Sequence, residues 1–356
     1  MKIQTAIETV DNKKALILGP CSAESLSQLE TIVKDSADLT ADFIRAGVWK
    51  PRTRPGHFQG IGAEALQWFT ELKKKYPVKF CTEVANAKHV ELCLKAEVDA
   101  LWIGARTTVN PFYVQEIATA LEGVDIPIFV KNPINPDLHL WLGAIERVYN
   151  AGIRKIAAIH RGFSFHGNSL YRNIPRWQIP IELKRRLPNL QLIADISHIS
   201  GTPTHLLEIA QIAMDLSYDG LMVETHPDPA RALSDSDQQI TLEYLKNNIL
   251  SKLIQRQQYT EDKKYNSLIT DIRSQIDKID HDIIKLIGKR MQLAEKIGTE
   301  KKSKKISILQ PERWNEIITK LLLLAKENKL SEEFVFSLIE AIHMESIQHQ
   351  SRKMNS

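Results

Sequence analysis

Eight short apolar runs, each followed by a stretch of helical period, restrict this chain to very few folds. The runs are rich in β-branched residues and end in turn or polar residues, as buried parallel strands do. They occupy residues 15–20, 46–51, 78–83, 99–105, 126–131, 154–161, 190–197 and 219–224. Eight strands alternating with helices predict a parallel sheet closed as a (β/α)8 TIM barrel. An open doubly wound sheet is the alternative, but Gly19-Pro20-Cys21 is not the GxGxxG turn that would favour it.

Glycine and proline are unevenly distributed, which indicates two domains. Of the 15 glycines 13 precede residue 260, and so do 14 of the 15 prolines. Because these residues punctuate turns between short elements, the architecture must change near that point. We expect a barrel at 1–256, a linker at 257–265 and an all-helical domain at 266–356.

The composition argues against several classes of protein. The chain is 43% hydrophobic and has no run of about 18 apolar residues, so we expect no membrane partner. The first residues lack the pattern of a signal peptide, so we expect a cytoplasmic protein. A net charge of +4 without a basic arm gives no support for nucleic-acid binding. The three cysteines, Cys21, Cys81 and Cys93, form no disulfide framework, so we expect reduced thiols or one metal ligand.

Each apolar run ends in polar or reactive side chains, at the end of the strand where barrel enzymes place their active sites. At any single position a capping or salt-bridged residue is the ordinary alternative, but eight strands in succession argue for chemistry. In strand order these residues are Cys21, Lys50, Glu83, Arg106, Lys131, His160, Asp195 with His198, and Glu224.

One subset suits metal ligation, because it combines a thiolate, an imidazole and two carboxylates. Its members are Cys21, His198, Glu224 and Asp235. Such a mixed set suits one borderline divalent ion, Mn, Fe, Co or Zn, better than Mg or Ca. Since no compact motif such as CxxC links the four residues, their spacing alone leaves open that they are unrelated.

A second subset, the cation set, places like charges together where packing would gain nothing. Its members are Arg45, Lys50, Arg52, Arg106, Lys131 and Arg161. Arginine binds carboxylate and phosphate bidentately and lysine acts as a point charge. We therefore expect small substrates that are phosphorylated and also carboxylated.

Seven motifs in order give this part of the chain a family resemblance. They are GPC at 19–21, KPRT at 50–53, GAR at 104–106, KN at 131–132, RG at 161–162, DISH at 195–198 and VETHPDPARALSD at 223–235. Together they resemble the type I-beta 3-deoxy-D-arabino-heptulosonate 7-phosphate (DAHP) synthases over about residues 10–255. These enzymes catalyse the first step of the shikimate pathway, the condensation of phosphoenolpyruvate with erythrose 4-phosphate.

The resemblance assigns roles to individual positions. It implies that the four residues of the first subset bind the metal ion. The implied contacts of phosphoenolpyruvate are Arg45, Lys50, Arg106, Lys131 and Arg161. The implied contacts of erythrose 4-phosphate are Lys50, Pro51, Arg52 and Thr53. We expect Lys50 to be catalytic, delivering a proton to the nascent alkoxide, with a pKa lowered by the neighbouring cations.

The C-terminal part has a different period. Apolar residues recur at intervals of three and four from Leu268 to Ile297, which predicts one helix of roughly 35 residues, about 50 Å long. Pro311 opens a second helix and Ser331 is a plausible N-cap of a third. A long helix with so much apolar surface cannot bury itself within one chain, so we expect a three-helix domain that forms a homodimer.

This part resembles the all-helical AroQ-type chorismate mutases, through IRSQIDKIDHDIIKLIGKRMQLAEKIGTEK and the terminal ESIQHQ. The matching substrate-binding positions are Arg273, from the partner in an intertwined dimer, Arg290, Lys301, Arg313 and Gln350. Arg290, Lys301 and Gln350 are the implied catalytic groups. Gln310 and Trp314 depart from the acidic residues usual in that family. An inert dimerisation module is the alternative.

The combination predicts a bifunctional enzyme that makes DAHP and rearranges chorismate to prephenate. We expect the helical domain to mediate feedback by prephenate or chorismate, because the segment before Cys21 is too short for a separate regulatory domain. Two alternatives remain: a synthase whose helical tail is a noncatalytic ligand sensor or dimerisation module, and another metal-dependent barrel aldolase.

Overall fold

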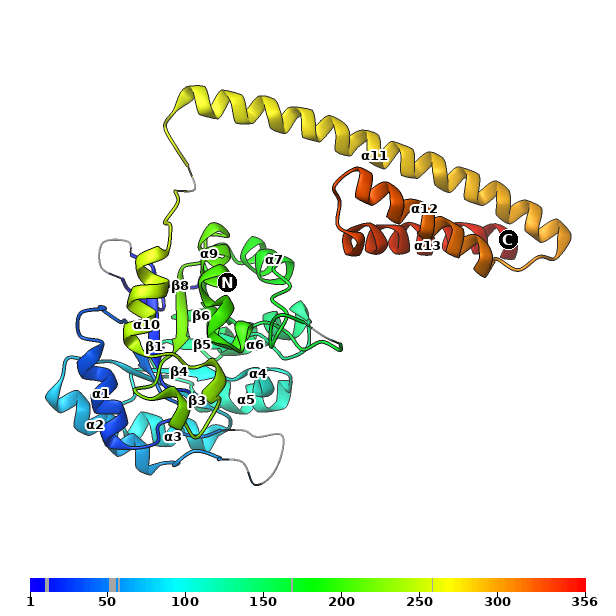
Figure 1. The fold of residues 1–356 in the computed structure, drawn as a ribbon. Helices are drawn as coiled ribbons and strands as arrows, with labels where there is room; N and C mark the ends of the chain where they lie inside the picture. Colours follow the sequence, from blue (N-terminus) through cyan, green and yellow to red (C-terminus); the bar gives the residue numbers. More distant parts are fainter. Residues whose placement is uncertain (10–12, 51–55, 57, 168, 258) are drawn as a thin grey trace. The chain divides into compact units, whose positions relative to one another are not determined.

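Eight parallel strands close into a barrel in the computed structural model (Figure 1). The structure describes residues 1–9, 13–50, 56, 58–167, 169–257 and 259–356. The strands pair in sequence order and β1 closes on β8, in register from Ala15 with Gly220 to Gly19 with Glu224. They are β1 (Ala15–Gly19), β2 (Phe43–Arg45), β3 (Phe80–Val84), β4 (Ala100–Ile103), β5 (Ile128–Lys131), β6 (Ile156–His160), β7 (Gln191–Asp195) and β8 (Gly220–Glu224). The predicted barrel is confirmed.

One predicted strand is displaced. The expected run at 46–51 is not β2, which is the preceding segment Phe43–Arg45. The side chains of Phe43 and Ile44 are the buried apolar pair, whereas Gly47 forms only an isolated bridge to Ser22 beyond the strand. Lys50 consequently lies on the connection after the strand.

Alternation along the strands separates two apolar layers, because successive side chains point to opposite faces. Ile17, Trp102 and Phe129 belong to a cluster made of strand residues with Ala6 and Ile7, which fills the barrel interior. Their neighbours, such as Leu18 and Leu101, pack with the surrounding helices in a second cluster. The helices of this unit are α1 (Leu26–Asp35), α2 (Glu64–Lys75), α3 (Ala87–Lys95), α4 (Ala105–Thr108), α5 (Pro111–Ala120), α6 (Leu138–Asn150), α7 (Gln178–Arg186), α8 (Ile196–Ser200), α9 (Leu206–Asp215) and α10 (Leu242–Tyr244).

The chain divides into two compact units, Met1–Gln258 and Tyr259–Ser356. The second unit consists of α11 (Lys263–Lys304), α12 (Pro311–Glu327) and α13 (Glu332–Asn355). At 42 residues α11 is longer than predicted. Pro311 opens α12 and the Ser331 hydroxyl caps α13 by accepting from the Phe334 amide, as predicted.

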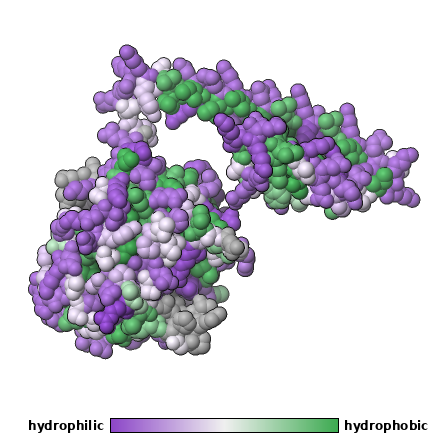
Figure 2. All heavy atoms as spheres, viewed as in Figure 1, coloured by the Kyte–Doolittle hydropathy of each residue, from purple (hydrophilic) through white to green (hydrophobic). Residues whose placement is uncertain are grey.

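The helical unit leaves much apolar surface uncovered. Its buried cluster is small, consisting of Ala325, Val335 and Ile339 with partly buried neighbours. Along α11, Ile272, Ile276 and other large apolar side chains are exposed, and a hydrophobic band follows this helix in Figure 2. In the part of the chain that the structure describes, no helix is both long and apolar enough to cross a membrane.

Candidate active site

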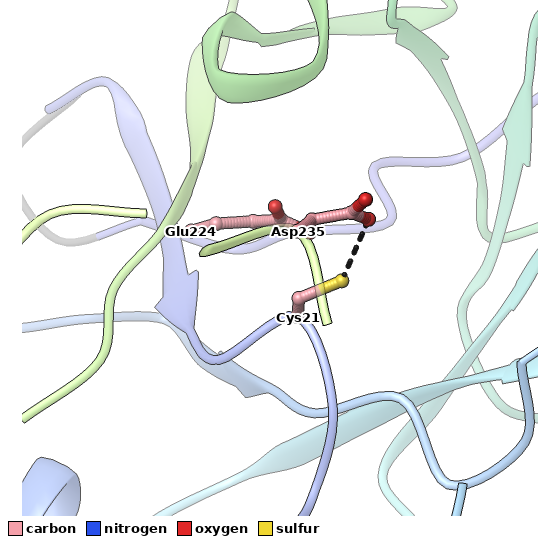
Figure 3. Close-up of side chains that lie close together, drawn as sticks. All are labelled: Cys21, Glu224 and Asp235. Atoms are coloured by element: carbon pink, nitrogen blue, oxygen red, sulfur yellow. Dashed lines mark hydrogen bonds between the residues drawn. The ribbon is translucent and has the colours of Figure 1, made fainter. Parts of the chain in front are cut away.

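Three of the four predicted metal residues meet at the C-terminal mouth of the barrel (Figure 3). Cys21 follows β1, Glu224 ends β8, and Asp235 lies in the connection that follows β8. One ligand atom from each lies within 4.8 Å of the others, and Cys21 Sγ is 3.1 Å from Asp235 Oδ2. Residues more than 200 positions apart are thus assembled by the closure of β1 on β8.

The fourth residue, His198, borders this cluster. It lies on α8, and its Nδ1 is 3.7 Å from Glu224 Oε1. The same nitrogen is 3.0 Å from an oxygen of the buried Asp195, so Asp195 orients the ring. His198 is not among the residues whose ligand atoms all lie within 4.8 Å of one another.

The electrostatics of the cluster fit a divalent cation. Burial raises the pKa of the Cys21 thiol to about 12, and Glu224 contributes to the rise. Burial also raises the pKa of the Glu224 carboxyl, but His198 and Arg45 outweigh it and the pKa is lowered. Glu224 Oε1 is buried and lies 2.8 Å from Arg45 Nη2, its ion-pair partner. A buried thiol beside two carboxylates that favour the charged form is a donor set that a cation would satisfy.

Lys50 joins this cluster to the cation set. Its Nζ donates a hydrogen bond to Cys21 Sγ at 3.0 Å. The prediction that neighbouring cations lower its pKa is wrong. Burial and Arg45 do lower the pKa of Lys50, but the opposing effects of Cys21, Glu224 and Glu83 are larger and the pKa is raised. Pro51, Arg52 and Thr53, predicted to contact erythrose 4-phosphate, lie outside the described residues.

Two members of the cation set have acidic partners within the protein. Arg45 Nη2 lies 2.8 Å from Glu224 Oε1, and Lys131 Nζ lies 2.8 Å from Asp195 Oδ2. Both cations are also placed against the Trp102 ring. Arg45 and Lys131 therefore have their charges balanced within the protein and do not require an external anion.

Arg161 and Arg106 complete the set. Burial, with the neighbouring cations Arg172 and Arg106, lowers the pKa of Arg161 to about 10, although Asp195 opposes the shift. Arg161 Nη1 donates to Asn173 Oδ1 at 2.6 Å. Arg106 lies on α4 and is exposed. Cationic groups crowded in this way favour the binding of an anion.

The helical unit contains a separate pocket of about 230 Å³ that brings together four of the five predicted mutase residues. They are Arg290, Lys301, Arg313 and Gln350. The fifth, Arg273, lies further toward the N-terminus of α11 and does not line this pocket. None of the described residues that line the pocket is acidic.

Within this pocket the cations are held by different partners. Arg290 donates to Ser346 Oγ, Lys301 Nζ donates to the Ile308 carbonyl at 2.6 Å, and Arg313 pairs with Glu316. The Oε1 atom of Gln350 is buried without a donor. The departure at Trp314 has a visible consequence, because its ring stacks on His343 at 4.1 Å between centroids.

Comparison with known families accounts for both units. The model of the DAHP synthetase I family matches residues 1–261. The chain belongs to the DAHP synthetase I family. The model of chorismate mutase type II matches residues 272–351, so the predicted fusion of the two domains is confirmed.

Individual relatives of this DAHP synthetase family member are distant. A Thermotoga maritima protein named phospho-2-dehydro-3-deoxyheptonate aldolase is 28% identical over 232 residues, 65% of this chain and 66% of its own length. A crystal structure of the Thermotoga maritima DAHP synthase, 26% identical, superposes with a TM-score of 0.59 over 66% of this chain and 67% of its own. A Polaromonas naphthalenivorans protein named 2-dehydro-3-deoxyphosphooctonate aldolase is 26% identical over 277 residues, 72% of this chain and 94% of its own length.

Sequence reasoning gave no role to several residues that organise the site of this family member. Asp195 is contacted by Lys131 and His198 and lies 3.8 Å from Arg45. Its position at the end of β7 was the available signal. Arg172 and Gln238 contact the carboxylates of the cluster, but they lie in connections where no periodicity marks them. His160, in contrast, is a core residue whose ring nitrogens contact the Pro175 carbonyl and the Tyr218 hydroxyl.

Proposed function

We propose that the barrel condenses phosphoenolpyruvate with erythrose 4-phosphate and consumes one water, which adds to the carbon that bears the phosphate, so that DAHP and phosphate are formed. One observation carries the proposal: Lys50 Nζ contacts Cys21 Sγ, so the cation set and the candidate metal residues form one continuous site. Binding of a small phosphorylated carboxylate next to a polarising metal ion is what this condensation requires. Membership of the DAHP synthetase I family supports the same reaction.

We assign different residues of the site to metal binding, substrate binding and proton donation. Cys21, Glu224 and Asp235, together with His198, would hold one divalent ion, Mn, Fe, Co or Zn. When bound, the ion supplies a Lewis acid for the aldehyde oxygen. Arg106 and Arg161 bind the phosphate of phosphoenolpyruvate, and Arg45, Lys50 and Lys131 orient its carboxylate. Lys50 stays protonated because its pKa is raised, and donates a proton to the oxygen that was the aldehyde.

For the helical domain we propose chorismate mutase activity. Chorismate carries two carboxylates and rearranges without a covalent intermediate, so catalysis needs cations for the carboxylates and donors for the ether oxygen. Arg290, Lys301 and Arg313 provide the cations, and the amide of Gln350 provides a donor beside them. We propose that the exposed face of α11 pairs with a second copy of the chain, which places Arg273 in the partner's site.

The fusion also supports feedback. We propose a barrel at 1–256, a linker at 257–265 and a mutase domain at 266–356, with chorismate or prephenate bound by the mutase domain inhibiting the barrel. A ligand that binds two domain arrangements unequally shifts their populations. The competing proposal is a mutase domain that only senses ligand or only dimerises.

A coupled assay tests these proposals. The protein is incubated with phosphoenolpyruvate, Mn²⁺ and erythrose 4-phosphate, and separately with chorismate; we expect both products. A five-carbon aldose phosphate serves as a parallel acceptor, because the relatives named phosphooctonate aldolases make an eight-carbon product. A preference for that acceptor would overturn the DAHP assignment. Unchanged condensation at saturating prephenate and chorismate would overturn feedback.

A further inference from the structure

The two carboxylates of the candidate metal cluster are held by a single relay of side chains. Arg172 Nη1 donates to Gln238 Oε1 at 2.5 Å, and Gln238 Nε2 donates to Glu224 Oε2 at 2.5 Å. The same guanidinium contacts Asp235 Oδ1 through both Nη1 and Nη2 at 3.2 Å. One arginine therefore reaches Asp235 directly and Glu224 through one amide.

The relay contacts one oxygen of each carboxylate, and the other oxygen of each faces a different group of the site. On Asp235, Oδ1 accepts from Arg172 while Oδ2 lies 3.1 Å from Cys21 Sγ. On Glu224, Oε2 accepts from Gln238, while the buried Oε1 lies 2.8 Å from Arg45 Nη2 and 3.7 Å from His198 Nδ1. A carboxylate fixed by one oxygen presents the other in a defined direction, which is how outer hydrogen bonds orient metal ligands.

The backbone of Arg172 is fixed as firmly as its side chain. Its amide donates to the Ser200 carbonyl at 3.0 Å, and the Asn173 amide donates to the Ile199 carbonyl at 3.2 Å. These bonds satisfy carbonyls at the C-terminal end of α8, the helix that carries His198. Gly201, at a φ of +76°, permits the approach, since a Cβ there would lie 2.3 Å from Arg172 Cβ.

The next residue links the same segment to the substrate side. The Asn173 amide group donates to the His198 carbonyl at 2.7 Å, and its Oδ1 accepts from Arg161. Arg172 and Asn173 therefore contact Asp235, the His198 carbonyl and Arg161 directly, and Glu224 through Gln238.

We propose that Arg172 and Gln238 are positioning residues that hold Asp235 and Glu224 in the geometry that binds the divalent ion. The inference rests on the proposed metal site. Arginine suits the role because its planar fork contacts an amide oxygen and a carboxylate at once, which a lysine cannot do. Removal of either member frees a carboxylate to rotate and weakens ion binding, although neither residue is a ligand.

The test measures Mn²⁺ binding to the metal-stripped full chain by isothermal titration calorimetry. Arg172→Ala and Gln238→Ala are each expected to weaken binding about 10–100-fold. Arg172→Lys is expected to recover less than half of that loss on a logarithmic scale. Because the relay acts as one unit, the double variant is expected to bind about as well as Arg172→Ala alone. Arg176→Ala, an exposed arginine of the same connection, is the matched control and is expected to bind as the parent does.

Two further measurements separate the possible failures. Co²⁺ absorption reports the ligand geometry independently of activity, and it is expected to change in Arg172→Ala but not in Arg176→Ala. Cys21→Ala tests the metal site itself, and Mn²⁺ binding equal to that of the parent would overturn the site. The relay alone would be overturned by a combination of two results. Cys21→Ala would lose Mn²⁺ binding, whereas the Arg172 and Gln238 variants would keep the parental Mn²⁺ affinity and Co²⁺ absorption. We expect metal-stripped Arg172→Ala to have the same melting temperature as the stripped parent. A lower melting temperature would assign Arg172 to folding instead.

Discussion

Lys131 Nζ lies 2.8 Å from Asp195 Oδ2, and both side chains are almost completely removed from solvent. Asp195 also contacts His198, so one buried carboxylate connects a proposed substrate cation to a proposed metal ligand. Burial would raise the pKa of Asp195, but His198 and Lys131 outweigh it and hold the pKa well below its usual range. The carboxylate is therefore charged at neutral pH and serves as the common counterion of the site.

Replacing this carboxylate leaves Lys131 as a buried cation without its partner. We expect Asp195→Asn to lower the free energy of unfolding by about 3–5 kcal/mol, measured by urea denaturation. The exposed pair of Asp125 and Lys155 gives the matched control. Asp125→Asn should cost less than about 1 kcal/mol, because solvent screens that pair. Equal effects of the two substitutions would contradict the role of Asp195 as a buried counterion.

His160 predicts a pH dependence of stability. Burial lowers its pKa from 6.5 to about 3. Between pH 6.5 and about 3 the unfolded chain binds a proton at His160 that the folded chain does not. The contribution of neutral His160 to the free energy of unfolding is therefore complete above pH 6.5 and is lost as the pH falls. The expected slope is about 1.4 kcal/mol per pH unit. In urea titrations at pH 7 and 5, His160→Gln should lose about 2 kcal/mol less on acidification than the parent.

The surface residue His205, which pairs with Glu208, provides the control for this measurement. His205→Gln should retain the acid sensitivity of the parent. If His160→Gln retains it as well, the buried imidazole is not the source.

The pKa of Cys21 predicts proton release on metal binding. Because the thiol has a pKa of about 12 in the stripped protein, it is protonated at pH 8 and must lose its proton to bind an ion. Calorimetric titration of Mn²⁺ in buffers of different ionisation enthalpy should show release of about one proton per ion. Cys21→Ser should release none at this pH, and release of no proton by the parent would remove Cys21 from the ligand set.

The fold was largely readable from the sequence, because strand period and turn residues are local signals. The displacement of β2 shows the limit: 46–51 and Phe43–Arg45 both contain buried apolar side chains, and pairing with β1 and β3 selects the latter. Local patterns could not decide which segment the barrel would enclose.

The site was readable through motifs more than through spacing. Cys21 and Asp235 meet only because the barrel closes, and no local period encodes that contact. The sequence placed Cys21, Glu83 and Glu224 on the same face as Lys50, but it did not show that their combined effect on the pKa of Lys50 exceeds that of burial and Arg45. The sequence did not indicate roles for Arg172 and Gln238, because their contacts depend on the path of two irregular connections.

The two proposed activities should be separable by substitution in the helical unit. Arg290 is half-buried and lines the cation pocket, where it donates to Ser346. Arg290→Ala removes a cation that would bind a chorismate carboxylate, so kcat/KM for chorismate should fall about 10²–10³-fold. Exposed Arg352, on α13, gives the control, and Arg352→Ala should rearrange chorismate at the parental rate. Without chorismate or prephenate, DAHP formation should be the same in all three proteins. Parental mutase activity in Arg290→Ala would remove the pocket from that reaction, whereas a parallel loss of both activities would show that the two units do not work independently.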